Sequence, residues 1–111
     1  MIDTIAHFYK TCSEPARLRI LNILLSYDAV CVCDVVTTLD LSQPLVSRHL
    51  SYLKNAGLAE VFKQGNWRYY GLSKQLTPLQ VAALNVLKQQ LDMDPQCIAD
   101  RNQFNPSVCG E

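Results

Sequence analysis

Apolar residues in the first half of the chain recur at the three- and four-residue spacing of an α-helix. Ile5, Phe8 and Cys12 follow this spacing near the N-terminus, and Leu21, Leu24 and Leu25 follow it further along. Serines that can cap a helix precede two of the periodic segments, and each is followed by a proline in the first turn. The spacing predicts helices over residues 3–11, from a cap at Ser13 to about residue 26, over 33–39, and from a cap at Ser42 to Gly57.

The pattern changes after Gly57. Residues 59–63 and 67–72 are two short β-prone runs joined by "QGN", which is typical of a β-hairpin. A last amphipathic helix is predicted from Thr77 to Leu91. The following residues contain two prolines and few periodic apolar positions, so we expect a loosely attached tail. We therefore divide the chain into a domain of residues 1–92 and a C-terminal tail of residues 93–111.

The order of these elements predicts a winged helix-turn-helix, a mainly α fold with one small β-hairpin (α+β). Two helices are joined by a short turn, the second helix is polar on its outer face, and a hairpin follows directly. Such a helix fits the major groove of DNA, and lysines and arginines on a hairpin can lie along the phosphate backbone. The pattern therefore favours binding to double-stranded DNA.

Charge supports this interpretation by its distribution rather than by its total. The formal net charge is zero. The segment from residue 42 to 70, however, has a surplus of three positive charges. It contains one acid, Glu60, and four basic residues, Arg48, Lys54, Lys63 and Arg68. A local surplus suits a protein that binds a polyanion through one surface.

The size and the cysteine content limit the remaining possibilities. A chain of 111 residues is suited to one domain, and no apolar run approaches the roughly 20 residues of a membrane span. The N-terminus lacks the pattern of a secretory signal, so we expect a cytoplasmic protein.

Cytosolic thiols are normally reduced, and five cysteines are an odd number. Both facts disfavour a disulfide scaffold and favour metal binding or thiol chemistry for a clustered pair.

Such a pair stands at the predicted start of the third helix, in "CVCD". Side chains two residues apart point about 200° away from each other in a regular helix, whereas they share a side in an extended segment. If Cys31 and Cys33 hold one ion together, we therefore expect the start of the helix to distort. Because that helix supports the recognition helix, the distortion would move the surface that reads DNA.

Several motifs together resemble the ArsR/SmtB family of metal-responsive bacterial repressors. They are "SEPARLRIL", "CVCD", "SQPLVSRHLSYLKNAGLAE" and "KQGNWRYYGL", and they lie in the order and at the spacing of the family between Ile5 and Leu91. "CVCD" is similar to the stretch found in arsenical-resistance operon repressors and in cadmium/lead repressors. The resemblance implies a homodimer, joined by the first and last helices, that occupies operator DNA until an effector releases it.

The resemblance also implies which residues contact DNA. Those of the recognition helix and of the wing are Gln43, Ser47, Arg48, His49 and Tyr52, and Lys63, Gln64, Asn66 and Arg68. Trp67, Tyr69 and Tyr70 are expected to anchor the hairpin on the core. For His49, a structural role within the fold is an equal alternative.

The effector implied by the resemblance is trivalent arsenic or antimony. It would bind to Cys31 and Cys33, and the repressor would then dissociate from its operator. Several arsenic repressors of this type carry a third cysteine where this chain has Val36. A third thiolate must then come from Cys97 or Cys109 in the tail, from Cys12, from the other subunit or from a small thiol. The alternative effectors are cadmium or lead, or oxidation of the thiols. The segment from Thr77 to Leu91 has neither histidine nor acid, which disfavours the zinc site of other family members.

Two other classes of function remain as alternatives. An enzyme that uses the thiols is disfavoured, because no histidine base neighbours the pair and no glycine-rich phosphate loop is present. A winged-helix module that binds only proteins is disfavoured by the basic surplus. No organic cofactor is expected.

Overall fold

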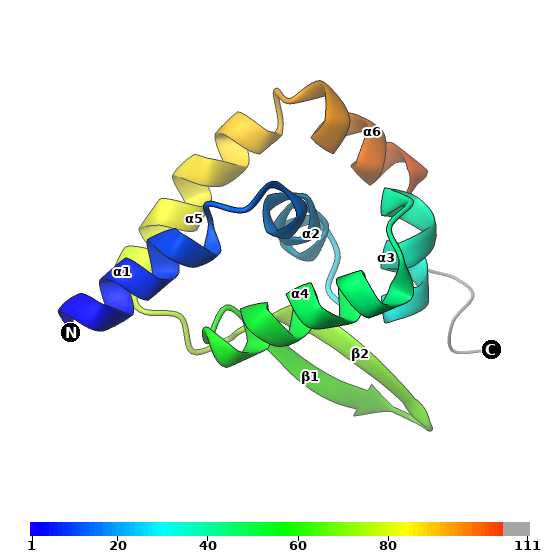
Figure 1. Cartoon of the computed structure of the whole chain (residues 1–111), viewed down its shortest axis with the longest axis horizontal. Coiled ribbons are helices and arrows are strands. Elements are labelled where there is room, and N and C mark those ends of the chain that lie inside the picture. Colours follow the sequence, from blue (N-terminus) through cyan, green and yellow to red (C-terminus); the bar gives the residue numbers. More distant parts are fainter. Residues whose placement is uncertain (106–111) are drawn as a thin grey trace.

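The computed structural model describes residues 1–105 and shows a winged helix-turn-helix, as predicted (Figure 1). The structure has six helices and one hairpin within these residues. In chain order the elements are α1 (Ile2–Thr11), α2 (Pro15–Ser26), α3 (Val32–Leu39), α4 (Gln43–Asn55), β1 (Ala59–Gln64), β2 (Trp67–Leu72), α5 (Pro78–Leu91) and α6 (Pro95–Gln103). None of these helices is both long and apolar enough to cross a membrane.

Local sequence signals explain where the helices begin. Proline occupies the first turn of α2, α4, α5 and α6, where its missing N–H has no intrahelical partner to lose. Ser42 caps α4 as predicted, and Thr77 forms a capping box with Gln80 at α5. The predicted cap of α2 was wrong by one residue. Glu14, not Ser13, accepts the first backbone N–H groups of that helix, those of Ala16 and Arg17.

The core forms around α2, which lies in the middle of the molecule (Figure 1). Ile20, Leu21 and Ile23 of α2 are fully buried, and they belong to one cluster with the apolar stripe of α4. That stripe consists of Val46, Leu50 and Leu53, each with no exposed surface. The helix spacing seen in the sequence therefore identifies the face that anchors α4 and leaves the opposite face of α4 free for function.

The hairpin is the wing of the fold. Its strands pair antiparallel, from Ala59 opposite Leu72 to Gln64 opposite Trp67, so the turn is Gly65-Asn66 rather than the predicted "QGN". Gly65 adopts φ 65°, a conformation that favours glycine. Tyr70 exchanges two backbone hydrogen bonds, of 2.7 and 2.9 Å, with Val30 in the segment before α3. The wing is therefore joined directly to the entrance of α3.

The expectation of a loosely attached tail was wrong for residues 95–104. Asp94 caps α6, and this helix packs against α2 and α3. Asp100 is 1 % exposed and receives two hydrogen bonds, of 2.9 and 3.0 Å, from Arg19 of α2. Phe104 is buried against the ring of Tyr27. Sequence periodicity missed α6 because polar contacts, rather than an apolar stripe, fasten most of it to the core.

Candidate functional site

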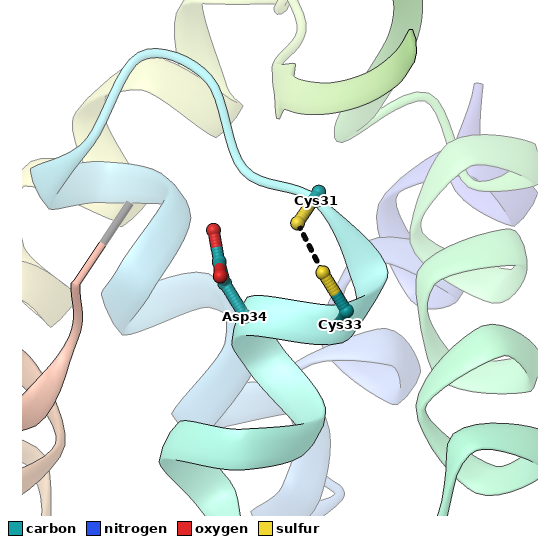
Figure 2. Close-up of side chains that lie close together, drawn as sticks. All are labelled: Cys31, Cys33 and Asp34. Carbon is teal, nitrogen blue, oxygen red and sulfur yellow. Dashed lines mark hydrogen bonds between the residues drawn. The ribbon is translucent and has the colours of Figure 1, made fainter. Parts of the chain in front are cut away.

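The two cysteines of the "CVCD" motif lie together at the start of α3. Their Sγ atoms are 2.9 Å apart, and Figure 2 shows the two side chains pointing toward each other. Cys31 is the N-cap of the helix with extended backbone angles (φ −97°, ψ 156°), and Cys33 is the second residue of the helix. The side chains converge because only one of the two cysteines lies inside the helix. The pair therefore has a converging geometry at a regular helix N-terminus, and the distortion expected when both cysteines hold one ion stays a prediction.

Asp34 completes a group of three potential ligands. One ligand atom from each of Cys31, Cys33 and Asp34 lies within 4.8 Å of the others, and no other such group of three occurs in residues 1–105. The carboxylate lies beside the sulfur atoms in Figure 2 and is 8 % exposed. An acid in the first turn of a helix, such as Asp34, is favoured by the helix dipole, although its carboxylate can also bind a metal ion. Its position three residues after the N-cap cysteine was the signal that places it beside the pair.

The environment of the pair differs between its two members. Cys31 is 5 % exposed, and Cys33 is exposed. Burial, reinforced by the neighbouring Asp34 carboxylate, raises the pKa of the Cys31 thiol to about 11. Cys31 is therefore protonated at neutral pH, and a metal ion that binds its thiolate must displace this proton.

The structure does not bring the other described cysteines into this group. Cys97 is buried in the first turn of α6, where its N–H donates to the Asp94 carboxylate and its carbonyl accepts from Asn22. Burial raises its pKa to about 11. Cys12 packs against the core, and burial also raises its pKa. Cys109 lies outside the described residues.

A polar surface is formed by the outer face of α4 and the wing. Gln43 and Arg48 are exposed on α4, and Ser47 is half-buried beside them. A hollow of about 410 Å³ on this face is lined by Ser47, Arg48, Ser51, Tyr52 and Asn55. The wing residues predicted to contact DNA, Lys63, Gln64, Asn66 and Arg68, are all exposed. Trp67, expected to anchor the hairpin, is instead 47 % exposed beside the turn.

His49 and Tyr52 are placed differently from the other residues predicted to contact DNA. The Tyr52 ring stacks on His7 of α1 at 5.6 Å between centroids, and the Arg17 guanidinium lies 4.0 Å from its centre. His49 Nε2 lies 3.7 Å from the Glu14 carboxylate. Tyr52 therefore contacts both α1 and α2, whereas His49 contacts the start of α2.

Short connections join the thiol pair to the polar surface. Cys31 directly follows Val30, the residue that pairs with Tyr70 of the wing. At the other end of α3, the carbonyl of Leu39 accepts from Arg19, and Asp40 ends the helix in the left-handed conformation. One end of α3 is therefore joined to the wing through Val30, and α3 also packs against α4.

Comparisons with known proteins agree with this arrangement. Residues 14–61 match the family described as "Bacterial regulatory protein, arsR family". The arsenic resistance transcriptional regulator ArsR2 of Pseudomonas putida is 35 % identical over 92 residues, which are 83 % of this chain and 77 % of that protein. The cadmium resistance transcriptional regulatory protein CadC of Listeria innocua is 34 % identical over 83 residues, 75 % of this chain and 69 % of the relative.

A solved structure shows the same fold. The homodimeric winged helix-turn-helix DNA-binding domain Mb0332 from Mycobacterium bovis superposes with a TM-score of 0.65 at 24 % identity, over 85 % of this chain and 87 % of that one. The recognition helix, the wing and the extent of the match to the regulators above lead to one conclusion. This chain belongs to the ArsR family of DNA-binding transcriptional regulators.

Proposed function

We propose that this protein represses transcription from an operator and releases it when trivalent arsenic or antimony binds the thiolates of Cys31 and Cys33. The observation that supports this proposal is the 2.9 Å approach of the two sulfur atoms at the start of α3. Thiolates are soft ligands and prefer soft acceptors to magnesium or calcium. Relatives named for arsenic resistance and for cadmium resistance support the same class of effector.

The DNA surface in this proposal consists of α4 and the wing. Gln43, Ser47 and Arg48 would face base edges and phosphates in the major groove. The exposed cationic and amide side chains of the wing would contact the adjacent phosphate backbone of the DNA. These residues are Lys63, Gln64, Asn66 and Arg68. Tyr52 instead contacts α1 and α2, and His49 contacts the start of α2.

The repressor would act as a homodimer. The outer sides of α1 and α5 carry exposed apolar residues, among them Ile2, Val81 and Val86, which are between 45 and 77 % exposed. An apolar hollow of about 360 Å³ lies between these two helices. A second copy of the chain would cover this surface, in line with the homodimeric neighbour.

Effector binding would act on DNA through the ends of α3. The bound ion replaces thiol protons and draws Cys31 and Cys33 towards a fixed coordination geometry. Because Val30 precedes Cys31 and pairs with Tyr70, this movement would shift the wing. A coupling free energy of about 1–3 kcal/mol lowers operator affinity some 5–150-fold, and operator DNA must weaken effector binding by the same factor.

Trivalent arsenic requires a third thiolate, and we propose Cys109 for this role before Cys97. The Phe104 ring packs on Tyr27, four residues before Cys31. Five further residues of extended chain span at most about 17 Å, which brings the neighbourhood of the pair within reach of Cys109. Cys97 could join the pair only if the first turn of α6, which Asp94 caps, came apart.

A second candidate effector is a divalent soft ion, cadmium or lead. The observation that favours it is Asp34, whose carboxylate lies within 4.8 Å of both sulfur atoms. A set of two thiolates and one carboxylate offers no third sulfur, but its mixed sulfur and oxygen ligands can hold a divalent ion. The arsenic site would then need the tail, whereas the cadmium or lead site would need Asp34.

A titration of the protein–operator complex tests the proposal. The reduced protein first selects a duplex from a random-sequence DNA library. Arsenite, antimonite, cadmium, lead or zinc is then added to the complex of the protein with this labelled duplex. The proposal expects release by arsenite and antimonite at the lowest concentrations. Release by cadmium or lead alone would favour the second candidate, and release only by an oxidant would overturn both.

A further inference from the structure

A second cluster of polar side chains lies where α1, α2 and α4 meet, outside the thiol site, and Arg17 is at its centre. The Arg17 Nε donates to the carbonyl of Thr11 at 2.9 Å, and Nη2 donates to that of Lys10 at 3.4 Å. These carbonyls end α1, where a cation is favoured by the helix dipole. Nη1 lies 3.5 Å from Nδ1 of His49. Arg17 therefore joins the end of α1 to the recognition helix.

The contact with α4 is centred on one aromatic ring, that of Tyr52. The Arg17 guanidinium lies 4.0 Å from the centre of the Tyr52 ring, and His7 of α1 stacks on the same ring. His49 and Tyr52 are three residues apart and lie on one side of α4. His49 is held in addition by Glu14, the cap of α2. One turn of the recognition helix is thus fastened to α1 and α2.

We propose that Arg17 is a positioning residue that fixes the recognition helix relative to α1, with Tyr52 and His49 as its partners rather than as readers of DNA. This inference rests on the proposed function, in which α1 takes part in the dimer. Recognition helices of a dimer must reach half-sites about 34 Å apart, one helical turn of DNA. If α4 rotated against α1 in each subunit, the two recognition helices of the dimer would no longer have this spacing.

A direct phosphate contact is the competing role for Arg17. The guanidinium is half-buried, and the interactions with two carbonyls, His49 and Tyr52 already use much of its binding capacity. Tyr52 also lines the hollow on the outer face of α4, so its hydroxyl is the group through which a DNA contact would be made. The two roles predict different behaviour when salt is added and when this hydroxyl is removed.

The salt dependence of DNA binding separates the roles of Arg17. The probe is a duplex selected by the wild-type protein from a random-sequence library. Arg17→Ala should weaken binding at least about 10-fold and leave the slope of log affinity against log salt unchanged. Arg68→Ala, the control for a phosphate contact, should lower that slope by about 0.9 for each subunit. A slope lowered by Arg17→Ala to the same extent would overturn the proposal.

Conservative variants provide the second test. Tyr52→Phe keeps the ring that Arg17 and His7 contact, and should bind the probe as the wild type does, whereas Tyr52→Ala should bind at least about 10-fold more weakly. Arg17→Lys keeps the charge but loses the planar group, and should resemble Arg17→Ala. Loss of affinity in Tyr52→Phe, or full affinity in Arg17→Lys, would contradict the proposal.

The two proposals fail in different ways in this experiment. If the wild-type protein selects no duplex from the library, the proposed DNA-binding function fails. If it selects a duplex but the variants show the slopes and affinities of direct contacts, only the positioning role fails. Should Arg17→Ala not fold, judged by circular dichroism, the comparison of Tyr52→Phe with Tyr52→Ala decides the question.

Discussion

The Sγ atoms of Cys31 and Cys33 lie 2.9 Å apart although the two residues are separated by only one position at a helix end. The approach is possible because Cys31 is an extended N-cap and Cys33 is already helical. Under the proposed function, two of the ligands for a soft ion would thus be held together before it binds, which would reduce the conformational entropy lost on binding. The free energy released when the ion forms its remaining bonds would then be available to move α3.

Asp34 should distinguish the two candidate effectors. Asp34→Asn removes a charged ligand for cadmium or lead and leaves the thiolates for arsenic. Loss of outer-shell partners of a metal already costs about 10–100-fold in affinity, so we expect cadmium and lead to bind at least about 10-fold more weakly. Arsenite binding should change little. Competition with a chromophoric chelator measures the divalent ions, with the exposed Asp28→Asn as control; equal loss in both variants would contradict this role.

The buried thiols should make the protein less stable in alkali. Burial raises the pKa of Cys97 to about 11 in the folded chain, above the value of about 8.5 for an unfolded cysteine. A raised folded pKa favours the protonated form, so this contribution to stability is complete below pH 8.5 and is lost as the pH rises to 11. Cys31 acts in the same direction.

The free energy of unfolding in urea should therefore fall between pH 8.5 and 11. Cys97→Ala should reduce this fall, because one of the two buried thiols no longer titrates. Cys33→Ala, which removes an exposed cysteine, serves as the comparison. A pH dependence that Cys97→Ala leaves unchanged would show that this thiol is accessible to water in the folded protein.

The attachment of α6 should depend on one ion pair. Asp100 is 1 % exposed and receives two hydrogen bonds from Arg19, which also donates to the Leu39 carbonyl. Asp100→Ala leaves Arg19 without its partner and should lower the free energy of unfolding by about 3 kcal/mol. Asp92→Ala removes an exposed acid that pairs with Lys88 and Arg101, and should cost at most about 1 kcal/mol.

Urea unfolding followed by circular dichroism compares these two variants. Equal losses of stability would mean that α6 is held by its apolar residues rather than by the ion pair. The same two variants test whether α6 is coupled to α3 through Arg19, which donates to Asp100 of α6 and to the Leu39 carbonyl of α3. Only Asp100→Ala should change the effector concentration that releases operator DNA.

Gly71 should be sensitive to the addition of a single methyl group. A Cβ at this position would lie 2.9 Å from the carbonyl oxygen of Asp28 and 3.2 Å from Cε1 of Phe62. Gly71→Ala must therefore displace the backbone two residues before Val30, and we expect a loss of about 1–3 kcal/mol. Gly57→Ala is the control, since its Cβ meets no atom within 4 Å and only its φ of 80° is unfavourable.

Thermal unfolding of the two glycine variants measures this difference. The strain at Gly57 should cost about 1 kcal/mol, without an effect on effector response. Gly71→Ala should in addition alter the response, because it moves the segment that joins the wing to the thiol pair. A response identical to that of the wild type would contradict the proposed path through Val30 and Tyr70.

The winged helix could be predicted from the sequence because its elements are marked by local signals. Ser42 and Pro44 define the start of α4, and the spacing of Val46, Leu50 and Leu53 defines its buried face. The helix predicted over residues 33–39 leaves Cys31 outside it, but the approach of the sulfur atoms could not be predicted, since it depends on the extended backbone angles of Cys31 and on the side-chain direction of Cys33 at the helix end. Helix boundaries are the least reliable part of a sequence-based assignment.

Contacts between distant residues were also outside the reach of sequence reasoning. Arg19 and Asp100 are separated by 81 positions, and nothing in the local pattern around either one identifies the other. His49 and Tyr52 lie at positions that the family resemblance assigns to DNA, yet their rings contact α1 and α2. Side-chain direction on a helix follows from its spacing, whereas the neighbour that a side chain meets depends on the packing of the whole chain.

Arsenite-induced release of operator DNA, compared between the wild-type protein and the Cys31→Ser, Cys33→Ser variant, tests the central claim most directly. Fluorescence anisotropy of the labelled duplex follows release in reducing buffer. We predict that the variant binds the duplex with the affinity of the wild type and stays bound at arsenite concentrations that release the wild type completely. Release of the variant at the same arsenite concentration would show that the thiol pair is not the effector site.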